Sequence, residues 1–186
     1  MPSFPLLSEP LAGRRVLVRD YAERDIPEIL LAYQDDATLH LRMGEERPPS
    51  GAELGRWAES EAADRASGVR AALTVLEPGS DDCAGQLYVH HVDWDHRRAE
   101  IGIWLAPAAR GRGLASDTLR LVGAWLLGHC GLERVQLLTE PDNEPMLRAA
   151  EAAGFVREGV LRAYLRERRT RVDVAILSLL PGDVRG

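Results

Sequence analysis

The sequence predicts a single α/β domain built on one mixed sheet, and three observations lead to this fold class. The chain has 186 residues, which is enough for one domain with a sizeable core. Hydrophobic residues make up 45% of it, as in a packed globular protein. Strand-like and helix-like patterns follow the order β-α-α-β-β-β-α-β-α-β-β, without a repeat, a linker or a low-complexity segment. This order favours strands and helices that share one sheet.

The first three elements follow from alternation and from helix capping. Polar and apolar residues alternate over residues 14–20, which predicts the first strand. Asp25 is placed to cap a helix over residues 26–34, with a proline in its first turn. The sequence Ser-Gly-Ala-Glu from Ser50 matches a capping box and predicts a helix that runs to about residue 66.

Three strands are expected in the middle of the chain. Residues 69–77 and 84–93 predict two strands, separated by a turn rich in Pro, Gly, Ser and Asp. Residues 99–105 form a nearly continuous apolar stretch, which is typical of a strand buried on both faces.

The second half of the chain continues with helices and strands. Apolar residues recur at helical spacing over residues 113–130, and a strand is expected at residues 134–139. Asn143 is placed to cap a helix over residues 144–153. Residues 160–165 and 172–180 then predict a final hairpin.

Charge and composition exclude several classes of partner and mechanism. The net charge is 23 − 29 = −6, which argues against a nucleic-acid partner. All the basic residues are arginines, so Schiff-base lysines and P-loop lysines are excluded. Cys83 and Cys130 share no metal-type spacing, and no metal site is predicted. There is no membrane-spanning stretch and no secretory signal, so a cytoplasmic location is expected.

The loop around residues 110–113 carries the strongest local signal. A buried strand runs into the sequence Arg-Gly-Arg-Gly, and a long helix follows at once. Glycines let the backbone approach a phosphate, and free N–H groups at the helix start point towards it. Arg110 and Arg112 are able to add charge-assisted hydrogen bonds. The motif therefore predicts an anion site, with a plain strand–loop–helix connection as the alternative.

Two other glycine-rich loops fit this stretch poorly. A Walker A loop needs a lysine, which the chain lacks. A dinucleotide-binding fingerprint needs a tight turn directly after the strand, whereas five residues separate Leu105 from Gly111 and Ser116 stands in the sixth position.

Several motifs together resemble the GNAT family of N-acetyltransferases. The sequence RGRGLA at residues 110–115 resembles the family's pyrophosphate motif, Q/R-x-x-G-x-G/A. The sequences NEPM at 143–146 and AEAAGF at 150–155 are similar to its N-x-x-S…E-K-x-G-F segment. The resemblance begins at Leu11 and extends to about Leu180.

The two ends of this region resemble the RimJ/RimL branch of the family. LAGRRVLVR at residues 11–19 is similar to that branch's opening, and EGVLR at 158–162 with RVDV at 171–174 to its ending. We therefore assign residues 11–181 to the acetyltransferase domain, with residues 1–10 as an N-terminal extension and 182–186 as a tail.

The resemblance implies the position of the cofactor, acetyl-CoA. The sheet is expected to be mostly antiparallel and to splay apart between strands 101–105 and 134–139, with the pantetheine arm in the gap. Main-chain groups near the first of these strands would bind that arm, and the glycine loop would bind the pyrophosphate. Asn143 either touches the cofactor arm or only caps its helix. The implied cofactor-binding residues are Ile103, Trp104, Leu105, Ala106, Arg110, Gly111, Arg112, Gly113, Leu114, Ala115 and Asn143.

Acetyl transfer to an amine also requires a base that removes the ammonium proton. The candidates are Glu100, His91 and His90. By alternation Glu100 shares a strand face with Gly102 and Trp104. The alternative role for Glu100 is an ion pair with Arg97 or Arg98. By the same alternation His91 shares a face with Leu87 and Val89, which is more typical of a packed histidine.

The acid that protonates the departing thiolate is less well defined. Met146 and Ala150 stand where the family often has a serine and a tyrosine. Tyr164 is the nearest substitute, and its alternative role is a core aromatic of the final hairpin.

We therefore expect an N-acetyltransferase that uses acetyl-CoA and acts on an amine. The resemblance implies a protein N-terminal α-amine, while a small-molecule amine or an antibiotic is an alternative acceptor. Residues 26–65 and 164–171 are expected to form the acceptor site. A non-catalytic acyl-CoA sensor is the competing class of function. Homodimers occur among relatives, and the sequence leaves the oligomeric state open.

Overall fold

The computed structural model describes residues 3–167 and 170–184. In this part of the chain eight strands form one sheet in the order β1-β2-β3-β4-β5-β6-β8-β7. Neighbouring strands are antiparallel except β5 and β6, which are parallel. The structure thus confirms the predicted α/β class with a mixed, mostly antiparallel sheet. Residues 1–2, 168–169 and 185–186, in the predicted extension, hairpin and tail, lie outside the described residues.

The elements lie close to the predicted positions. The strands are β1 (Leu11–Ala12), β2 (Leu17–Asp20), β3 (Ala71–Leu76), β4 (Gly85–Asp93), β5 (Arg98–Leu105), β6 (Arg134–Thr139), β7 (Val156–Glu167) and β8 (Thr170–Leu179). The main helices are α1 (Ile26–Asp35), α2 (Leu39–Arg42), α3 (Gly51–Ala66), α4 (Leu114–Gly128) and α5 (Glu144–Ala153). Neither β1 nor α2 was predicted, because both are too short to show a periodic pattern.

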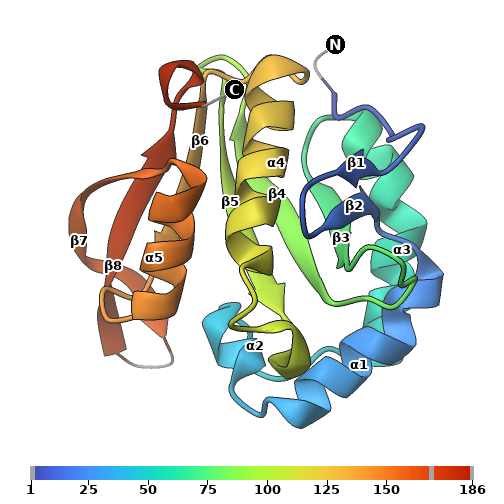
Figure 1. Cartoon of the computed structure of the whole chain (residues 1–186). Coiled ribbons are helices and arrows are strands. Elements are labelled where there is room, and N and C mark those ends of the chain that lie inside the picture. Colours follow the sequence, from blue (N-terminus) through green and yellow to red (C-terminus); the bar gives the residue numbers. More distant parts are fainter. Residues whose placement is uncertain (1–2, 168–169, 185–186) are drawn as a thin grey trace.

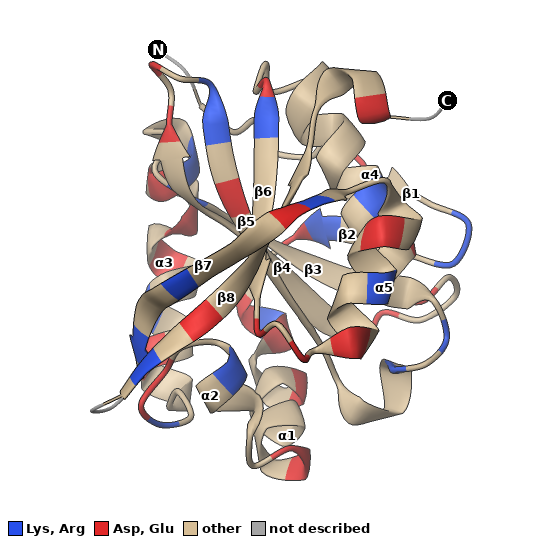
Figure 2. Ribbon diagram, turned by 90° about the vertical axis from the view of Figure 1, so that its left-hand side faces the viewer, with Lys and Arg blue, Asp and Glu red and all other residues tan. Residues whose placement is uncertain are grey.

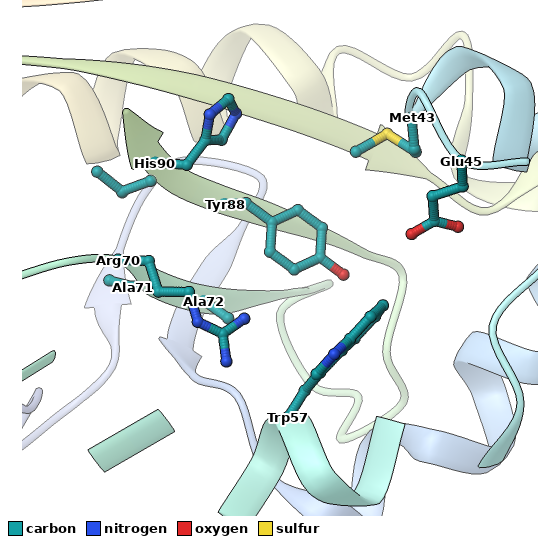
Figure 3. Close-up of a pocket in the computed structure, with 9 residues that line it drawn as sticks. Met43, Glu45, Trp57, Arg70, Ala71, Ala72, Tyr88 and His90 are labelled. Carbon is teal, nitrogen blue, oxygen red and sulfur yellow. The ribbon is translucent and has the colours of Figure 1, made fainter. Parts of the chain in front are cut away.

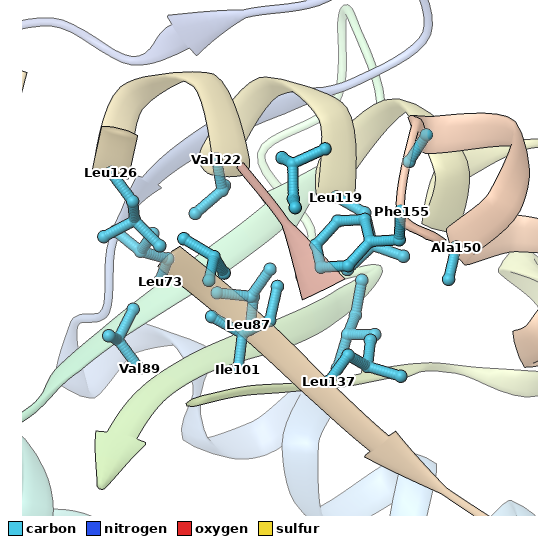
Figure 4. Packing of buried hydrophobic residues seen from close by; sticks show 14 of the residues in the cluster. Leu73, Leu87, Val89, Ile101, Leu119, Val122, Leu126, Leu137, Ala150 and Phe155 are labelled. Carbon is cyan, nitrogen blue, oxygen red and sulfur yellow. The ribbon is translucent and has the colours of Figure 1, made fainter. Parts of the chain in front are cut away.

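The main hydrophobic core lies between the sheet and helices α4 and α5. Residues at alternate positions of the central strands, such as Leu73, Leu87 and Ile101, are almost completely buried on this face. They pack against Leu119 and Val122 of α4, as Figure 4 shows. In Figure 1, α4 and α5 lie side by side in front of the strands.

The opposite face of the sheet packs against α1, α2 and α3. The intervening strand positions, including Ala72 and Trp104, belong to this second cluster with Ile29 of α1 and Leu54 of α3. Strand β5 therefore buries side chains on both faces, as its continuous apolar sequence predicted. Tyr33 of α1 packs against Trp104 with ring centroids 6.0 Å apart.

The segments at the two ends of the described chain take different positions: the first is packed into the core, and the last forms one edge of the sheet. Phe4, within the predicted extension, is 2% exposed and packs against the aromatic rings of Trp94 and Trp125. Strands β7 and β8 form a long hairpin at one edge of the sheet, and Figure 2 shows that both signs of charge are spread along it.

Within the described residues, no helix combines the length and the apolar character needed to cross a bilayer.

Candidate active site

The glycine loop adopts the backbone conformation expected of an anion site. Gly111 and Gly113 have φ angles of 74° and 81°, in the left-handed region that glycine enters without steric cost. Gly113 is the N-cap residue of α4. The first helical hydrogen bond runs from the N–H of Asp117 to the carbonyl of Gly113, over 3.2 Å. The N–H groups before Asp117 are the ones that a helix start leaves for a ligand.

A side chain at Gly113 would have to displace the flexible guanidinium of Arg15. A Cβ atom at this position would lie 2.6 Å from Nη1 of Arg15. The Arg15 guanidinium, 47% exposed, lies 3.8 Å from the carboxylate of Asp117. A third arginine therefore stands beside the loop in addition to Arg110 and Arg112. These donors fit a phosphate-bearing cofactor.

The two arginines of the motif are held by carboxylates of other segments. Arg112 forms a two-pronged ion pair with Glu77, and its Nη1 lies 2.7 Å from Oε1. Arg110 donates through Nε to the carbonyl of Leu105 over 2.9 Å, and its Nη2 lies 2.7 Å from Oδ2 of Asp36. Both guanidinium groups are partly exposed, so each is able to exchange a carboxylate for a phosphate.

Asp36 is a strong partner for Arg110. Its burial would raise the pKa of the carboxyl, but hydrogen bonds from Thr38 and Arg110 lower this pKa to about 2. The carboxylate therefore stays charged at neutral pH. It connects the segment after α1 to the glycine loop, a contact between residues 74 positions apart in the sequence.

The parallel strands β5 and β6 separate where the cofactor arm was predicted to lie. Their pairing runs from Arg98 and Arg134 to Ile101 and Leu137 and stops there, although β5 continues to Leu105. On its other side β5 stays paired with β4 as far as Leu105. Main-chain groups of Gly102 to Leu105 that face β6 thus lack a strand partner, which fits the predicted role of Ile103, Trp104 and Leu105. Ala106, the next predicted residue, already uses its N–H in a hydrogen bond to the carbonyl of Ala84.

Asn143 acts as a helix cap. Its Oδ1 accepts a hydrogen bond from the N–H of Met146 over 3.3 Å, at the start of α5. Its Nδ2 donates to Oγ1 of Thr139, the last residue of β6. These bonds fix the side chain beside the separated end of β6, so the cap lies next to the expected cofactor arm.

Glu100 lies at the centre of a small polar cluster on β5. Glu100 is 9% exposed, and its carboxylate accepts a hydrogen bond from Nε2 of Gln136 over 3.3 Å. Nδ1 of His90 lies 3.9 Å from Oε1 of Glu100, and Nδ1 of His91 lies 3.5 Å from Oε2. The three candidate bases are therefore brought together at one place.

The alternative ion pairs expected for Glu100 were wrong. Arg97 pairs with Glu133, over 2.9 Å, and Arg98 pairs with Asp93, over 3.1 Å. Both arginines are more than half exposed, because the turn before β5 directs them to solvent.

The predicted orientation of His91 was also wrong. A β-bulge shifts the register of β4 and β5 between His90 and Asp93, and His91 has a φ angle of 48°. Instead of following Leu87 and Val89 into the core, its imidazole turns towards His90, with ring centroids 4.7 Å apart. The side chain is 76% exposed.

His90 is the more buried of the two histidines. Burial lowers its pKa below the usual value, and the neighbouring His91 acts in the same direction, while Glu100 opposes both. At neutral pH the ring is therefore mainly neutral and has a free nitrogen lone pair.

A cavity of about 230 Å³ opens next to His90 on the face covered by α1, α2 and α3. Figure 3 shows that Trp57 of α3 and Tyr88 of β4 approach each other across it, with Met43 and Glu45 on the side of α2. Burial raises the pKa of Glu45, and its Oε2 accepts a hydrogen bond from the hydroxyl of Tyr33 over 3.3 Å. The predicted segment 26–65 thus supplies part of the lining.

Tyr164 takes neither a core position nor a place in this polar cluster. It is 48% exposed on β7, next to Ala163, whose φ angle of 51° marks a second bulge. The alternative role as a core aromatic was therefore wrong. Ala150, where the family often has a tyrosine, is completely buried beside Phe155 (Figure 4).

Several residues of this region were not predicted from the sequence. Tyr88 could have been predicted from the sequence, since it lies two positions before His90 on the same strand face. To predict Gln136, one has to know that β6 pairs with β5. To predict the lining residues Met43, Glu45 and Trp57, one has to know how α2 and α3 pack onto the sheet. To predict Arg15, one has to know that the segment before β2 lies next to the start of α4.

Comparison with known proteins identifies the family of this fold. The Acetyltransferase (GNAT) domain family matches residues 15–156. The chain is 33% identical over 96 residues to the uncharacterized N-acetyltransferase YoaA of Bacillus subtilis strain 168, over 52% of this chain and 54% of YoaA. It spans less than two thirds of the length of that relative and of others like it.

Two solved structures have a similar fold. The ribosomal-protein-S5-alanine acetyltransferase from Vibrio fischeri has a TM-score of 0.80 at 16% identity, over 95% of this chain and 99% of that chain. RimL, a ribosomal L7/L12 alpha-N-protein acetyltransferase solved with coenzyme A, also has a TM-score of 0.80 at 16% identity, over 92% and 98%. At these identities the similarity concerns the fold alone. The family match, which covers more than half of the sequence, shows that this chain belongs to the GNAT family of acetyl-CoA-dependent acetyltransferases.

Proposed function

We propose that this protein transfers the acetyl group of acetyl-CoA to a primary amine that enters the cavity beside His90. The observation that carries this proposal is the position of Glu100. It is one residue before the point where β5 and β6 separate, and it pairs across the sheet with His90, which lines the cavity. A carboxylate thus stands between the expected cofactor gap and the expected acceptor site.

The residues of the chain have separate roles in this reaction. Acetyl-CoA supplies a thioester whose acetyl carbon is open to attack by an amine. Glu100, held by Gln136, takes the proton of the amine, directly or through His91. The glycine loop and its arginines hold the phosphates, and unpaired main-chain groups of β5 hold the cofactor arm. Proximity of the two substrates supplies much of the rate enhancement.

Part of the cavity lining suits a slender cationic acceptor. Glu45 offers a carboxylate, and Trp57 and Tyr88 offer aromatic faces that attract an ammonium group. Arg70 also lines the cavity, and its charge is paired with that of Asp64 over 2.7 Å. A second cavity of about 460 Å³ shares Glu45 and Trp57 and adds Glu46 and Glu53, with Arg47 as its single basic residue. We propose a peptide N-terminus as the acceptor, since RimL and the S5-alanine enzyme are described as acting on ribosomal proteins.

The experiment is a turnover assay with a panel of amines. Acetyl-CoA is mixed with peptides that begin in Ala or Ser, with a polyamine and with an aminoglycoside, and free thiol is measured. We expect thiol release with the peptides and a mass increase of one acetyl group at the α-amine. Release with only the small amines would reassign the acceptor. Binding of acetyl-CoA without release with any amine would make the protein a sensor.

Replacement of Glu100 tests the base. Glu100→Gln keeps the shape of the side chain and its contact with Gln136 but removes its basicity. We expect kcat/KM to fall about 10²–10⁴-fold while acetyl-CoA affinity, measured by calorimetry, stays the same. His91→Ala is the paired variant. Full activity of Glu100→Gln with a large loss in His91→Ala would make the histidine the base.

A further inference from the structure

The polar cluster on β4 and β5 has the donor set of a transition-metal site. Two imidazole nitrogens and one carboxylate converge from His90, His91 and Glu100, and their donor atoms all lie within 4.8 Å of one another. No other group of three or more His, Cys, Asp or Glu side chains within residues 3–167 and 170–184 comes this close. No metal site was predicted here, because Cys83 and Cys130 share no metal-type spacing.

The donor atoms are close enough together to surround a single ion, although the two separations that involve Glu100 are somewhat wider than those of a tetrahedral zinc site. Nδ1 of His90 lies 3.1 Å from Nδ1 of His91, and these two nitrogens lie 3.9 Å from Oε1 and 3.5 Å from Oε2 of Glu100, respectively. Zinc–nitrogen and zinc–oxygen bonds of about 2.0–2.1 Å at tetrahedral angles place neighbouring ligands about 3.3–3.4 Å apart.

The backbone brings these groups together by a specific irregularity. Regular alternation would place adjacent residues such as His90 and His91 on opposite faces of the sheet. His90 faces Glu100 through the regular register of β4 and β5, and the bulge with the positive φ angle of His91 turns the second ring to the same face. Gln136 donates to Glu100 and fixes the carboxylate from the other side. Such outer hydrogen bonds orient metal ligands in known sites.

We propose that His90, His91 and Glu100 form a binding site for a divalent ion of the Zn²⁺ class. Two nitrogens and one carboxylate suit Zn²⁺ or Co²⁺ rather than the all-oxygen preference of Mg²⁺ and Ca²⁺. Three protein ligands leave one position of the ion open. The exposed side of His91 faces solvent, so a water or a small ligand is able to reach that position.

The ion would act as an inhibitor of acetyl transfer. This consequence, unlike the metal site itself, rests on the proposed function. An ion bound to Glu100 occupies the lone pairs that accept the proton of the amine. Free Zn²⁺ is then expected to lower turnover without displacing acetyl-CoA from the glycine loop.

The test uses the full-length protein with any affinity tag removed. Zn²⁺ binding is measured by calorimetry, and Co²⁺ binding by the visible absorption of the tetrahedral ion. Wild type is compared with His91→Ala, Glu100→Gln and the control His96→Ala. His96 is an exposed histidine whose Nδ1 lies 3.0 Å from both oxygens of Asp93, so it tests for binding at an ordinary surface pair.

We expect one Zn²⁺ per chain in wild type and in His96→Ala. Affinity should fall by at least about 10–100-fold in His91→Ala and in Glu100→Gln, since the loss of an outer-shell partner alone has an effect of that size. Because His91 is exposed, its variant should fold even where Glu100→Gln does not. No saturable binding, or binding lost only in His96→Ala, would overturn the site. Zn²⁺ binding that leaves turnover intact would support the site and contradict the role of Glu100 as the base.

Discussion

At the scale of single residues, Arg112 offers the sharpest test of the cofactor loop. Its guanidinium is 53% exposed and pairs with Glu77, so a phosphate is able to take the place of the carboxylate. We expect Arg112→Ala to weaken acetyl-CoA binding by about 1.5–3 kcal/mol, the usual loss of a hydrogen bond to a charged group. Calorimetry with acetyl-CoA measures the change.

A matched control is available in Arg97. Arg97 lies in the turn before β5. Its guanidinium is 61% exposed and pairs with a single carboxylate, that of Glu133. Arg97→Ala should leave acetyl-CoA affinity unchanged. Equal losses in both variants would point to a general effect of net charge, and no loss in Arg112→Ala would remove this arginine from the phosphate site.

Tyr164 remains our candidate for the acid that protonates the departing thiolate. Because the side chain is 48% exposed, Tyr164→Phe should leave the melting temperature unchanged. We expect a lower kcat with unaltered acetyl-CoA affinity, measured by steady-state kinetics and calorimetry. Undiminished kcat would mean that the thiolate leaves without a tyrosine acid.

At the scale of elements, the start of α3 controls the acceptor cavity. Ser50 caps this helix, and its side chain and backbone exchange hydrogen bonds with Glu53 in a capping box. Ser50→Ala should lower the free energy of unfolding by about 1 kcal/mol, within the range of ~0.5–2 kcal/mol for lost caps. Because Trp57 lies two turns further along α3, we also expect a higher KM for the amine.

Urea denaturation with the control Glu59→Ala checks this prediction. Glu59 is exposed on the same helix, so its replacement should change stability by less than about 0.5 kcal/mol. A Ser50 variant as stable as the Glu59 variant would show that tertiary packing, and not the cap, holds the start of α3.

At the scale of the whole molecule, paired carboxylates should determine stability towards acid. Glu158 of β7 receives hydrogen bonds from Arg134 of β6 and Ser178 of β8, and these lower its pKa to about 2. Because folding lowers the pKa of Glu158, its ionised carboxylate stabilises the native state at pH values above the pKa of the unfolded chain, near 4.5. This contribution to the free energy of unfolding is lost as the pH falls towards 2. Asp36 behaves in the same way.

Thermal unfolding of Glu158→Gln between neutral and acidic pH measures this effect. The melting temperature of wild type should fall below about pH 4.5, and the variant should show a shallower fall from a lower starting value. The Glu158 side chain is 39% exposed, so its contribution should stay below about 1 kcal/mol. Parallel curves for the two proteins would exclude Glu158 as a cause of the acid sensitivity.

Most elements could be predicted because their causes are local. The strand at residues 134–139 and the helix at residues 144–153 have the predicted bounds, since alternation, a capping asparagine and a terminal glycine are all encoded within a few residues. The glycine loop was predicted for the same reason: its left-handed backbone and the helix start that follows are properties of residues 111–113 themselves.

What depends on contacts between distant residues could not be predicted. The bulge at His91 arises where β4 meets β5, and it reversed the orientation that alternation predicted. The pairing of Arg110 with Asp36 and of Glu100 with Gln136 likewise follows from how the elements pack.

The sequence by itself therefore determined most of the elements, the family and the backbone conformation of the glycine loop. Only the tertiary structure decided how Glu100, His90 and His91 meet and which residues line the cavity beside them. The physical reason is that backbone conformation responds to near neighbours in the chain, whereas a site is assembled by side chains that packing brings together.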